Sequence, residues 1–198
     1  MNELITNLEK NGFEVLRAKN KEEAFTLAKD FIKEGMRVGL GGSTSVAQIG
    51  LLDYVTSLKN ITLFNQYEAG ISMEENTRRR REGILSDLYI TSSNAITENG
   101  ELVNADGSGN RVAAQIFGPK KVLLIAGINK IVPNLQAGFE RIMQVAAVKN
   151  IERMNAKAIQ MGKEPHYNLE NIGNKFAYIN GDEKGRTTII LVNEELGY

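Results

Sequence analysis

The sequence predicts an α/β protein with three layers, α/β/α, around a mostly parallel sheet. Three observations favour this class. Segments with the two-residue period of strands alternate with segments of helical period along most of the 198 residues. The runs KVLLIAGI and TTIILV are apolar without interruption, as strands buried on both faces are. Two glycine-rich loops each follow a predicted strand and precede a helix, which is where open α/β sheets bind ligands.

The periodicity places each element in turn. The predicted elements are a helix at 2–10, a strand at 13–18, a helix at 20–35, a strand at 36–42, a helix at 43–59, a strand at 61–67, a helix at 72–86, a strand at 87–96, a short strand at 101–107, a helix at 110–118, a strand at 120–128 and one long or two joined helices at 134–161. Segments 175–181 and 187–196 are predicted to form a final strand pair joined by the turn GDEKG. We expect one domain over residues 1–198, with the helix and strand of residues 1–20 packing on its core.

Composition narrows the possible functions. The formal net charge is zero, so no nucleic acid or anionic membrane surface is expected as a partner. The chain has no cysteine, which excludes disulfides, thiolate metal sites, Fe–S ligation and a cysteine nucleophile. The first residues lack the pattern of a signal peptide, and no apolar run approaches membrane-spanning length. A cytoplasmic location is therefore the expectation.

The first glycine-rich loop is GLGGSTS, at the junction of a strand and a helix. Unpaired N–H groups at a helix start attract anions, and glycines allow an anion to approach the backbone. The alternative is a tight turn in which Ser43 only caps the helix. A dinucleotide fingerprint would need glycine in place of Thr44, a nucleophile elbow would need glycine in place of Ser45, and a Walker lysine is absent. The binding candidates of this loop are Gly41, Gly42, Ser43 and Thr44.

The second loop is NADGSGN, again before a helix. Its polar residues can cap the helix or bond the local backbone, yet two such loops are more than turns require. Both loops should lie at the carboxyl edge of the sheet, and strand order decides whether they adjoin. Arg111 stands where the helix dipole disfavours a cation, so it is expected to serve a ligand or an internal carboxylate. The binding candidates here are Asn94, Asn104, Gly107, Ser108, Gly109, Asn110 and Arg111.

Three further residues could carry the chemistry. Glu98 and Asp106 are the acid/base candidates, and either could also be the internal partner of Arg111. The alternative for Glu98 is an exposed turn residue. Lys130 follows the most apolar strand and could hold a phosphate or carboxylate, or could be a solvated lysine at a strand end.

The four arginine side chains of the run RRRR, residues 78–81, point to all sides of the predicted helix. Pairing of Arg78 and Arg79 with preceding glutamates predicts a solvated face, and the alternative is that one arginine turns inward to a ligand phosphate. His166 is the only histidine, and no metal motif or catalytic triad can be built around it. We assign no metal site.

Residues 93–132, SNAITENGELVNADGSGNRVAAQIFGPKKVLLIAGINKIV, resemble the LUD domain, the lactate-utilisation protein family. The segments VGLGGSTSVAQIGLLD and GRTTIILVNEELGY resemble the same family in the same order. The resemblance implies the fold of ribose-5-phosphate isomerase, glucosamine-6-phosphate deaminase and CoA transferases, whose glycine-rich loops hold sugar phosphates or CoA thioesters. Relatives often carry cysteines after the long helix; the corresponding region here, MNAKAIQMGKEPHYNLENIGNKF, has none. We therefore assign this chain no Fe–S or metal role.

The resemblance also implies a system that oxidises L-lactate to pyruvate with Fe–S partner proteins. From loops and resemblance together, the expected ligand is a small anionic or phosphorylated metabolite or a CoA thioester, with Fe–S oxidoreductases as possible partners and a homo-oligomer as a possible state. No cofactor is identified. Two functions stay open: an isomerase- or transferase-like enzyme or subunit of an oxidising complex, and a non-catalytic binding or regulatory module.

Overall fold

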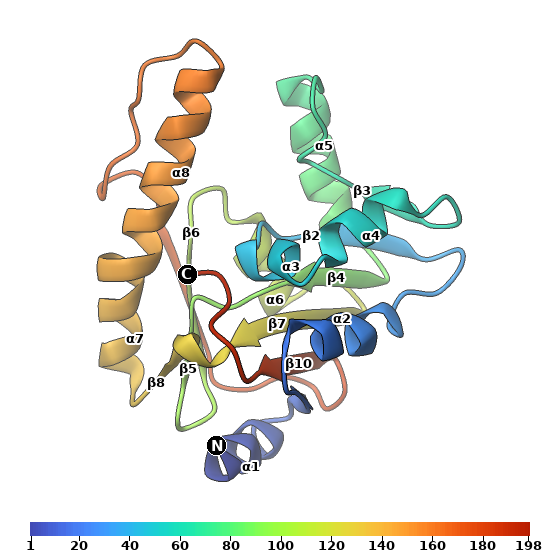
Figure 1. The fold of residues 1–198 in the computed structure, drawn as a ribbon, viewed down its shortest axis with the longest axis vertical. Helices are drawn as coiled ribbons and strands as arrows, with labels where there is room; N and C mark the ends of the chain where they lie inside the picture. The colour runs from blue at the N-terminus through green and yellow to red at the C-terminus, as the bar shows by residue number, and fades with distance from the viewer.

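The computed structural model describes residues 1–198 and is built around a six-stranded parallel sheet (Figure 1). The third and fourth strands in spatial order form the centre of this sheet. In spatial order the strands are β1 (Glu14–Ala18), β10 (Thr187–Val192), β7 (Lys121–Gly127), β4 (Leu88–Thr91), β2 (Arg37–Leu40) and β3 (Thr62–Phe64). The prediction of a mostly parallel sheet is confirmed.

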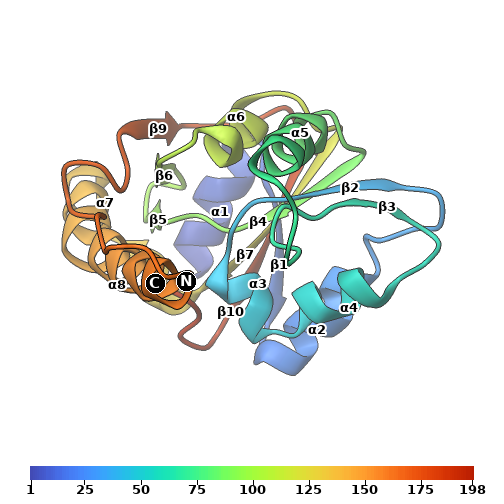
Figure 2. The same ribbon diagram turned by 90° about the horizontal axis from the view of Figure 1, so that it is seen from above.

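Helices cover both faces of this sheet, which gives the predicted three layers (Figure 2). One face carries α1 (Asn2–Lys10), α5 (Met73–Ile84) and α6 (Asn110–Ile116); the other carries α2 (Lys21–Lys29), α3 (Thr44–Gln48) and α4 (Leu51–Ser57). The core under α2 to α4 is the larger, and a second core joins α1 to the opposite face. Helix α5 approaches β2 closely because Gly39 and Gly83 meet: a Cβ on Gly39 would lie 2.4 Å from the Gly83 carbonyl oxygen.

A second sheet of four short strands lies beside the first. Its order is β8 (Ile131–Val132), β5 (Ala95–Thr97), β6 (Leu102–Asp106) and β9 (Lys175–Ile179), and β6 runs antiparallel to both of its neighbours. A 3₁₀ turn at Ile128–Lys130 connects β7 to β8. Helix α7 (Leu135–Arg141), a π-helical segment (Ile142–Ala146) and α8 (Ala147–Gln160) form one continuous projection, opposite the projection formed by α5 (Figure 1).

The predicted pairing of the last two strands is wrong. Strand β9 pairs with β6 in the second sheet, whereas β10 lies between β1 and β7 in the first. All six residues of β10 are buried, while β9 exposes most of its side chains, so β10 fits a sheet centre and β9 an edge.

Two long predicted elements are each divided. The predicted strand 87–96 becomes β4 and β5, which belong to different sheets, with residues 92–94 between them. The predicted helix 43–59 becomes α3 and α4, separated at Gly50, whose φ of +78° suits glycine. None of the helices combines the length and the apolar character needed to cross a membrane.

Candidate functional site

The two glycine-rich loops adjoin at the carboxyl edge of the main sheet. Strand β2 pairs with β4, and the Gly41 amide donates to the carbonyl oxygen of Ile90 at 2.9 Å. A Cβ on Gly41 would lie 2.7 Å from Thr91 Oγ1 and 3.1 Å from Cγ of Arg111. The first loop therefore lies against the helix that follows the second loop.

The chain's own side chains occupy the space that the first loop's glycines leave. A Cβ on Gly42 would come within 2.5 Å of the Tyr67 hydroxyl oxygen. Ser43 caps α3, since its Oγ accepts from the amide of Val46 at 3.1 Å. Thr44 is half-buried at the start of this five-residue helix. The capping function considered for this loop is thus present, and its glycines are explained by close packing.

The second loop is closed by its own carboxylate. Asp106 Oδ2 accepts from the amides of Arg111 at 3.0 Å and of Val112 at 3.4 Å, where an anion would bind the start of α6. Gly109 has a φ of +93°, in the region that favours glycine, and the carbonyl oxygen of Gly107 accepts from Lys175 Nζ at 2.7 Å. Asp106 therefore caps a helix, and its oxygen atom is already engaged.

The Arg111 guanidinium pairs with neither Asp106 nor Glu98, the two carboxylates expected as its internal partners. The guanidinium instead bridges the turn after β4 and strand β6, and so ties the two sheets together. It donates to four oxygen atoms, none of them a carboxylate: the backbone oxygens of Ser92 at 3.2 Å and Ala105 at 2.5 Å, and the Oδ1 atoms of Asn94 at 2.7 Å and Asn104 at 3.1 Å.

Lys130 is buried rather than solvated, with only 3% of its surface exposed. Its Nζ donates to Ser92 Oγ at 2.9 Å and to the Ser93 carbonyl oxygen at 3.0 Å, and it has no carboxylate partner. Burial lowers the pKa of Lys130 to about 7, and the charges of Arg141 and Arg111 act in the same direction.

Arg141 on α7 completes what we call the inner basic cluster, defined as Arg111, Lys130 and Arg141. Its guanidinium donates to the backbone oxygens of Asn129 at 3.0 Å and Asn94 at 2.6 Å, and burial lowers its pKa. No member of the cluster forms an ion pair, and all three side chains donate only to neutral oxygen atoms.

One buried donor at the inner basic cluster lacks an acceptor, and one buried acceptor nearby, Gln115 Oε1, lacks a donor. Asn104 is fully buried, its Oδ1 accepts from Arg111, and its Nδ2 has no partner. A buried donor without an acceptor costs about 1–3 kcal/mol, and a buried cation without a counter-charge costs more. An anion placed here would supply both the missing acceptor and the missing negative charge.

The arginine run divides between the two expected behaviours. Arg78 and Arg79 each pair with Glu75, as the spacing predicts. Arg80 turns inward, where its guanidinium donates to Ser108 Oγ at 2.6 Å and its buried Nε has no partner. One arginine of the run therefore faces the candidate site.

Glu98 and Asn110 lie outside the inner basic cluster. Glu98 is exposed at the turn after β5, where its backbone oxygen accepts from Asn7 Nδ2 at 2.8 Å and its amide donates to Val132. Asn110 Nδ2 donates to the Tyr89 hydroxyl at 3.3 Å. No group of three or more histidine, cysteine, aspartate or glutamate side chains is arranged to hold a metal ion.

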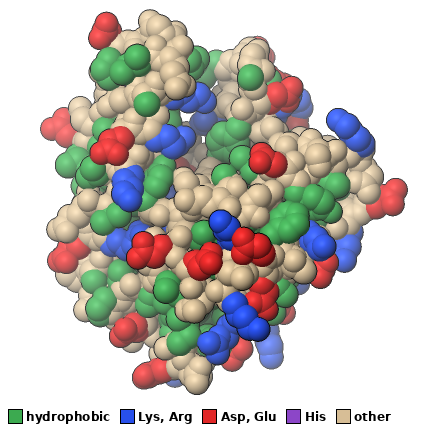
Figure 3. Space-filling model, viewed as in Figure 1, with side chains coloured by type: hydrophobic (Ala, Val, Ile, Leu, Met, Phe, Trp, Pro, Cys, Tyr) green, Lys and Arg blue, Asp and Glu red, His purple; other side chains and the backbone are tan.

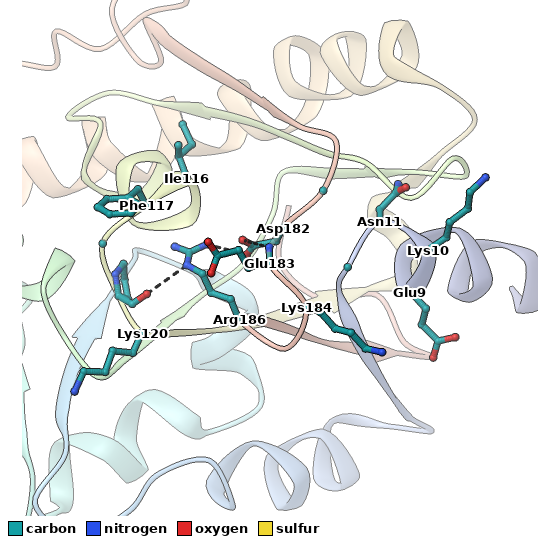
Figure 4. Close-up of a pocket in the computed structure, with 14 residues that line it drawn as sticks. Glu9, Lys10, Asn11, Ile116, Phe117, Lys120, Asp182, Glu183, Lys184 and Arg186 are labelled. Atoms are coloured by element: carbon teal, nitrogen blue, oxygen red, sulfur yellow. Dashed lines mark hydrogen bonds and ion pairs between the residues drawn. The ribbon is translucent and has the colours of Figure 1, made fainter.

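An open depression of about 800 Å³ lies at the opposite, amino-terminal edge of the sheet (Figure 4). Its most enclosed cation, Arg186, pairs with Asp182 at 2.8 Å and donates to backbone oxygens of α6. We place the candidate site at the carboxyl edge, where the buried Lys130 has no such carboxylate partner.

Sequence reasoning missed three residues that the structure brings to this region, namely Tyr67, Arg141 and Arg153, and it left open which arginine of the run turns inward. Arg80 and Arg81 both lack an acidic residue three or four positions away, so spacing alone does not separate them. Tyr67, Arg141 and Arg153 carry no local signal, since each comes from a different element and only the fold brings them together.

Comparisons with known proteins agree with this architecture. The family model described as LUD domain matches residues 1–192. A crystal structure of a DUF162 family protein from Deinococcus radiodurans is similar in fold, with a TM-score of 0.52 and 12% sequence identity over 96% of this chain and 94% of that chain. No curated protein sequence matches the chain significantly. The match over nearly all of its length shows that the chain belongs to the LUD domain family.

Proposed function

We propose that this protein binds a small anionic metabolite, through a carboxylate or phosphate group, at the inner basic cluster. One observation carries the proposal: Lys130 is buried between two arginines and bonded only to neutral oxygen atoms. A bound anion would offset the desolvation of all three cations and would hold Lys130 in its charged form.

The helix starts contribute less to this proposal than the cations do. Helices α3 and α6 have five and seven residues, and Ser43 and Asp106 already cap them. The ligand is therefore expected to be held mainly by side chains, with the loops shaping the walls of the site.

Turnover by a carboxylate base has little support from the geometry. The Asp106 carboxylate bonds two amides, and Glu98 lies apart from the cluster. This favours the second candidate function, a non-catalytic binding or regulatory module. If the protein is an enzyme, Lys130 is the better proton acceptor, because its pKa of about 7 leaves a neutral amine available near neutral pH.

Family membership supports a finer proposal, that the metabolite is L-lactate or pyruvate and that the protein acts in lactate oxidation. Both compounds are small carboxylates of the kind that the inner basic cluster would bind. The chain has no cysteine, so any Fe–S cluster of such a system would be held by partner proteins.

The test is ligand-induced stabilisation. The intact protein is heated with L-lactate, pyruvate, inorganic phosphate, sugar phosphates or CoA thioesters, each in turn. A ligand at about 100 times its dissociation constant adds about 2.7 kcal/mol to the free energy of unfolding. We expect at least one anion to stabilise the protein, and Lys130→Met to abolish the effect.

A matched control is Lys120→Met, which changes a lysine of 80% side-chain exposure that pairs with Asp87 at the other edge of the sheet. It should leave the stabilisation unchanged. Equal stabilisation of Lys130→Met and of the unaltered protein by every anion would contradict the proposal, as would the absence of any stabilising anion. Assays of turnover with the stabilising compound then separate the enzyme from the binding module.

A further inference from the structure

Two arginines and a tyrosine outside the inner basic cluster form a second set of side chains. We call Tyr67, Arg80 and Arg153 the outer basic group; they come from the loop after β3, from α5 and from α8. Arg153 donates to the Tyr198 hydroxyl at 2.9 Å and to Asn150 Oδ1 at 2.6 Å, both neutral. Neither arginine of the group forms an ion pair, although Arg78 on the same helix as Arg80 pairs with two glutamates.

The Tyr67 hydroxyl lies against the first glycine-rich loop. That oxygen accepts from Gln66 Nε2 at 2.9 Å and lies over Gly42, where a Cβ would meet it at 2.5 Å. Although 40% of the Tyr67 surface is exposed, desolvation raises its pKa; the bond from Gln66 and the positive charges of Arg80, Arg153 and Arg111 oppose that rise.

The space between the two helical projections is open in this region. Figure 3 shows the molecule hollowed between α8 and α5, with basic side chains in and beside the hollow. Arg80 Nε is a buried donor without an acceptor, as Asn104 Nδ2 is beside the inner basic cluster.

Arg111 connects the two sets of cations. Its Cγ lies beside Gly41 in the first glycine-rich loop. The positive charge of its guanidinium acts to lower the pKa of Tyr67 and that of Lys130. The five basic side chains of the two sets form no ion pair with a carboxylate.

We propose that the ligand carries two anionic groups, a carboxylate at the inner basic cluster and a phosphate at the outer basic group. The proposal rests on the proposed function and deepens it, because it defines the ligand as a phosphorylated carboxylic acid. It is carried by two sets of cations without ion pairs and by two unsatisfied buried donors, Asn104 Nδ2 beside the inner basic cluster and Arg80 Nε in the outer basic group.

The assignment of the two groups follows from donor geometry and burial. Guanidinium groups present forked donors that match phosphate oxygens, and the outer group offers two of them together with a phenolic hydroxyl. The inner basic cluster is more deeply buried, and a small singly charged carboxylate costs less to desolvate there than a doubly charged phosphate.

Calorimetric titration with three probes tests the proposal: phosphoglycolate, which carries both groups, glycolate, which carries the carboxylate, and methyl phosphate, which carries the phosphate. We expect phosphoglycolate to bind at least about 100-fold more tightly than either half, because the second contact becomes intramolecular. Titrations are run below the pKa of Lys130, where its amine is charged.

Variants separate the two sets of cations. Arg80→Ala should weaken phosphoglycolate and methyl phosphate about 10- to 100-fold, the range for losing a charged hydrogen bond, and leave glycolate unchanged. Lys130→Met should weaken glycolate and phosphoglycolate and leave methyl phosphate unchanged. Arg78→Ala, on the same helix and already ion-paired, is the matched control and should change none of the three affinities.

The outcomes distinguish this inference from the proposed function. If glycolate binds and requires Lys130, but phosphoglycolate binds no more tightly or Arg80→Ala weakens both alike, the outer phosphate site is wrong and the inner site stands. If none of the three probes binds, both proposals fail. Tighter binding by pyrophosphate, added as a fourth probe, than by phosphoglycolate would overturn the carboxylate assignment.

Discussion

Replacing Lys130 by methionine removes a buried ammonium group that has no carboxylate partner. Methionine fills a similar volume without a charge, so the desolvation cost disappears together with two hydrogen bonds. The charged groups that act on the amine are the guanidiniums of Arg141 and Arg111. The pH dependence of the difference between the two proteins therefore belongs to Lys130.

The sign and size of that dependence follow from the pKa. In the folded protein the pKa of Lys130 is lowered from 10.5 to about 7. Below the folded value both states hold the proton, and between the two values only the unfolded chain holds it, so the free energy of unfolding rises with pH there. Integrating this linkage from about pH 6.5 to about pH 8.5 gives a rise of about 2 kcal/mol from this one group.

Urea denaturation of both proteins at several pH values in this range measures the effect. We expect the unaltered protein to gain about 2 kcal/mol relative to Lys130→Met as the pH rises. A difference that stays constant across the range would show that the folded protein does not desolvate the amine, and the electrostatic basis of the proposed site would be lost.

Three other predictions test local features. Asp106→Ala should lower the free energy of unfolding by about 1 kcal/mol in urea denaturation, while Asp106→Asn, which still caps, should cost much less; equal costs would refute the capping role. Gly42→Ala should cost about 1–3 kcal/mol, and Tyr67→Phe should relieve part of that cost in a double-mutant cycle, so additive effects would contradict the close contact. Glu98→Gln should leave anion affinity within about twofold by calorimetry, because Glu98 is exposed and is held through its backbone; a larger loss would place it in the site.

The sequence determined the fold class because the relevant signals are local. Alternation of strand and helix periods requires no knowledge of distant contacts, and an uninterrupted apolar run such as 187–192 already indicates burial on both faces. The same locality placed Ser43 at a helix start and paired Arg78 and Arg79 with Glu75, three and four positions away.

Partnership between distant segments was decided only by the tertiary structure. Strand β9 belongs to β6 rather than to its neighbour β10, because hydrogen-bond pairing is set by packing across the whole chain. Strand order also made the two glycine-rich loops adjoin, and it placed Tyr67 against Gly42 where the sequence suggested room for an anion.

The tertiary structure also decided the charge of the candidate site. Lys130 at the end of a strand could equally have been solvated, and Arg111 could have paired with Asp106 or Glu98. The fold buries Lys130, gives Arg111 neutral oxygen atoms, and commits Asp106 to a helix cap. Burial and the distribution of counter-charges depend on every element that surrounds a side chain, so residue type and spacing identified these cations but could not show that they converge without a carboxylate.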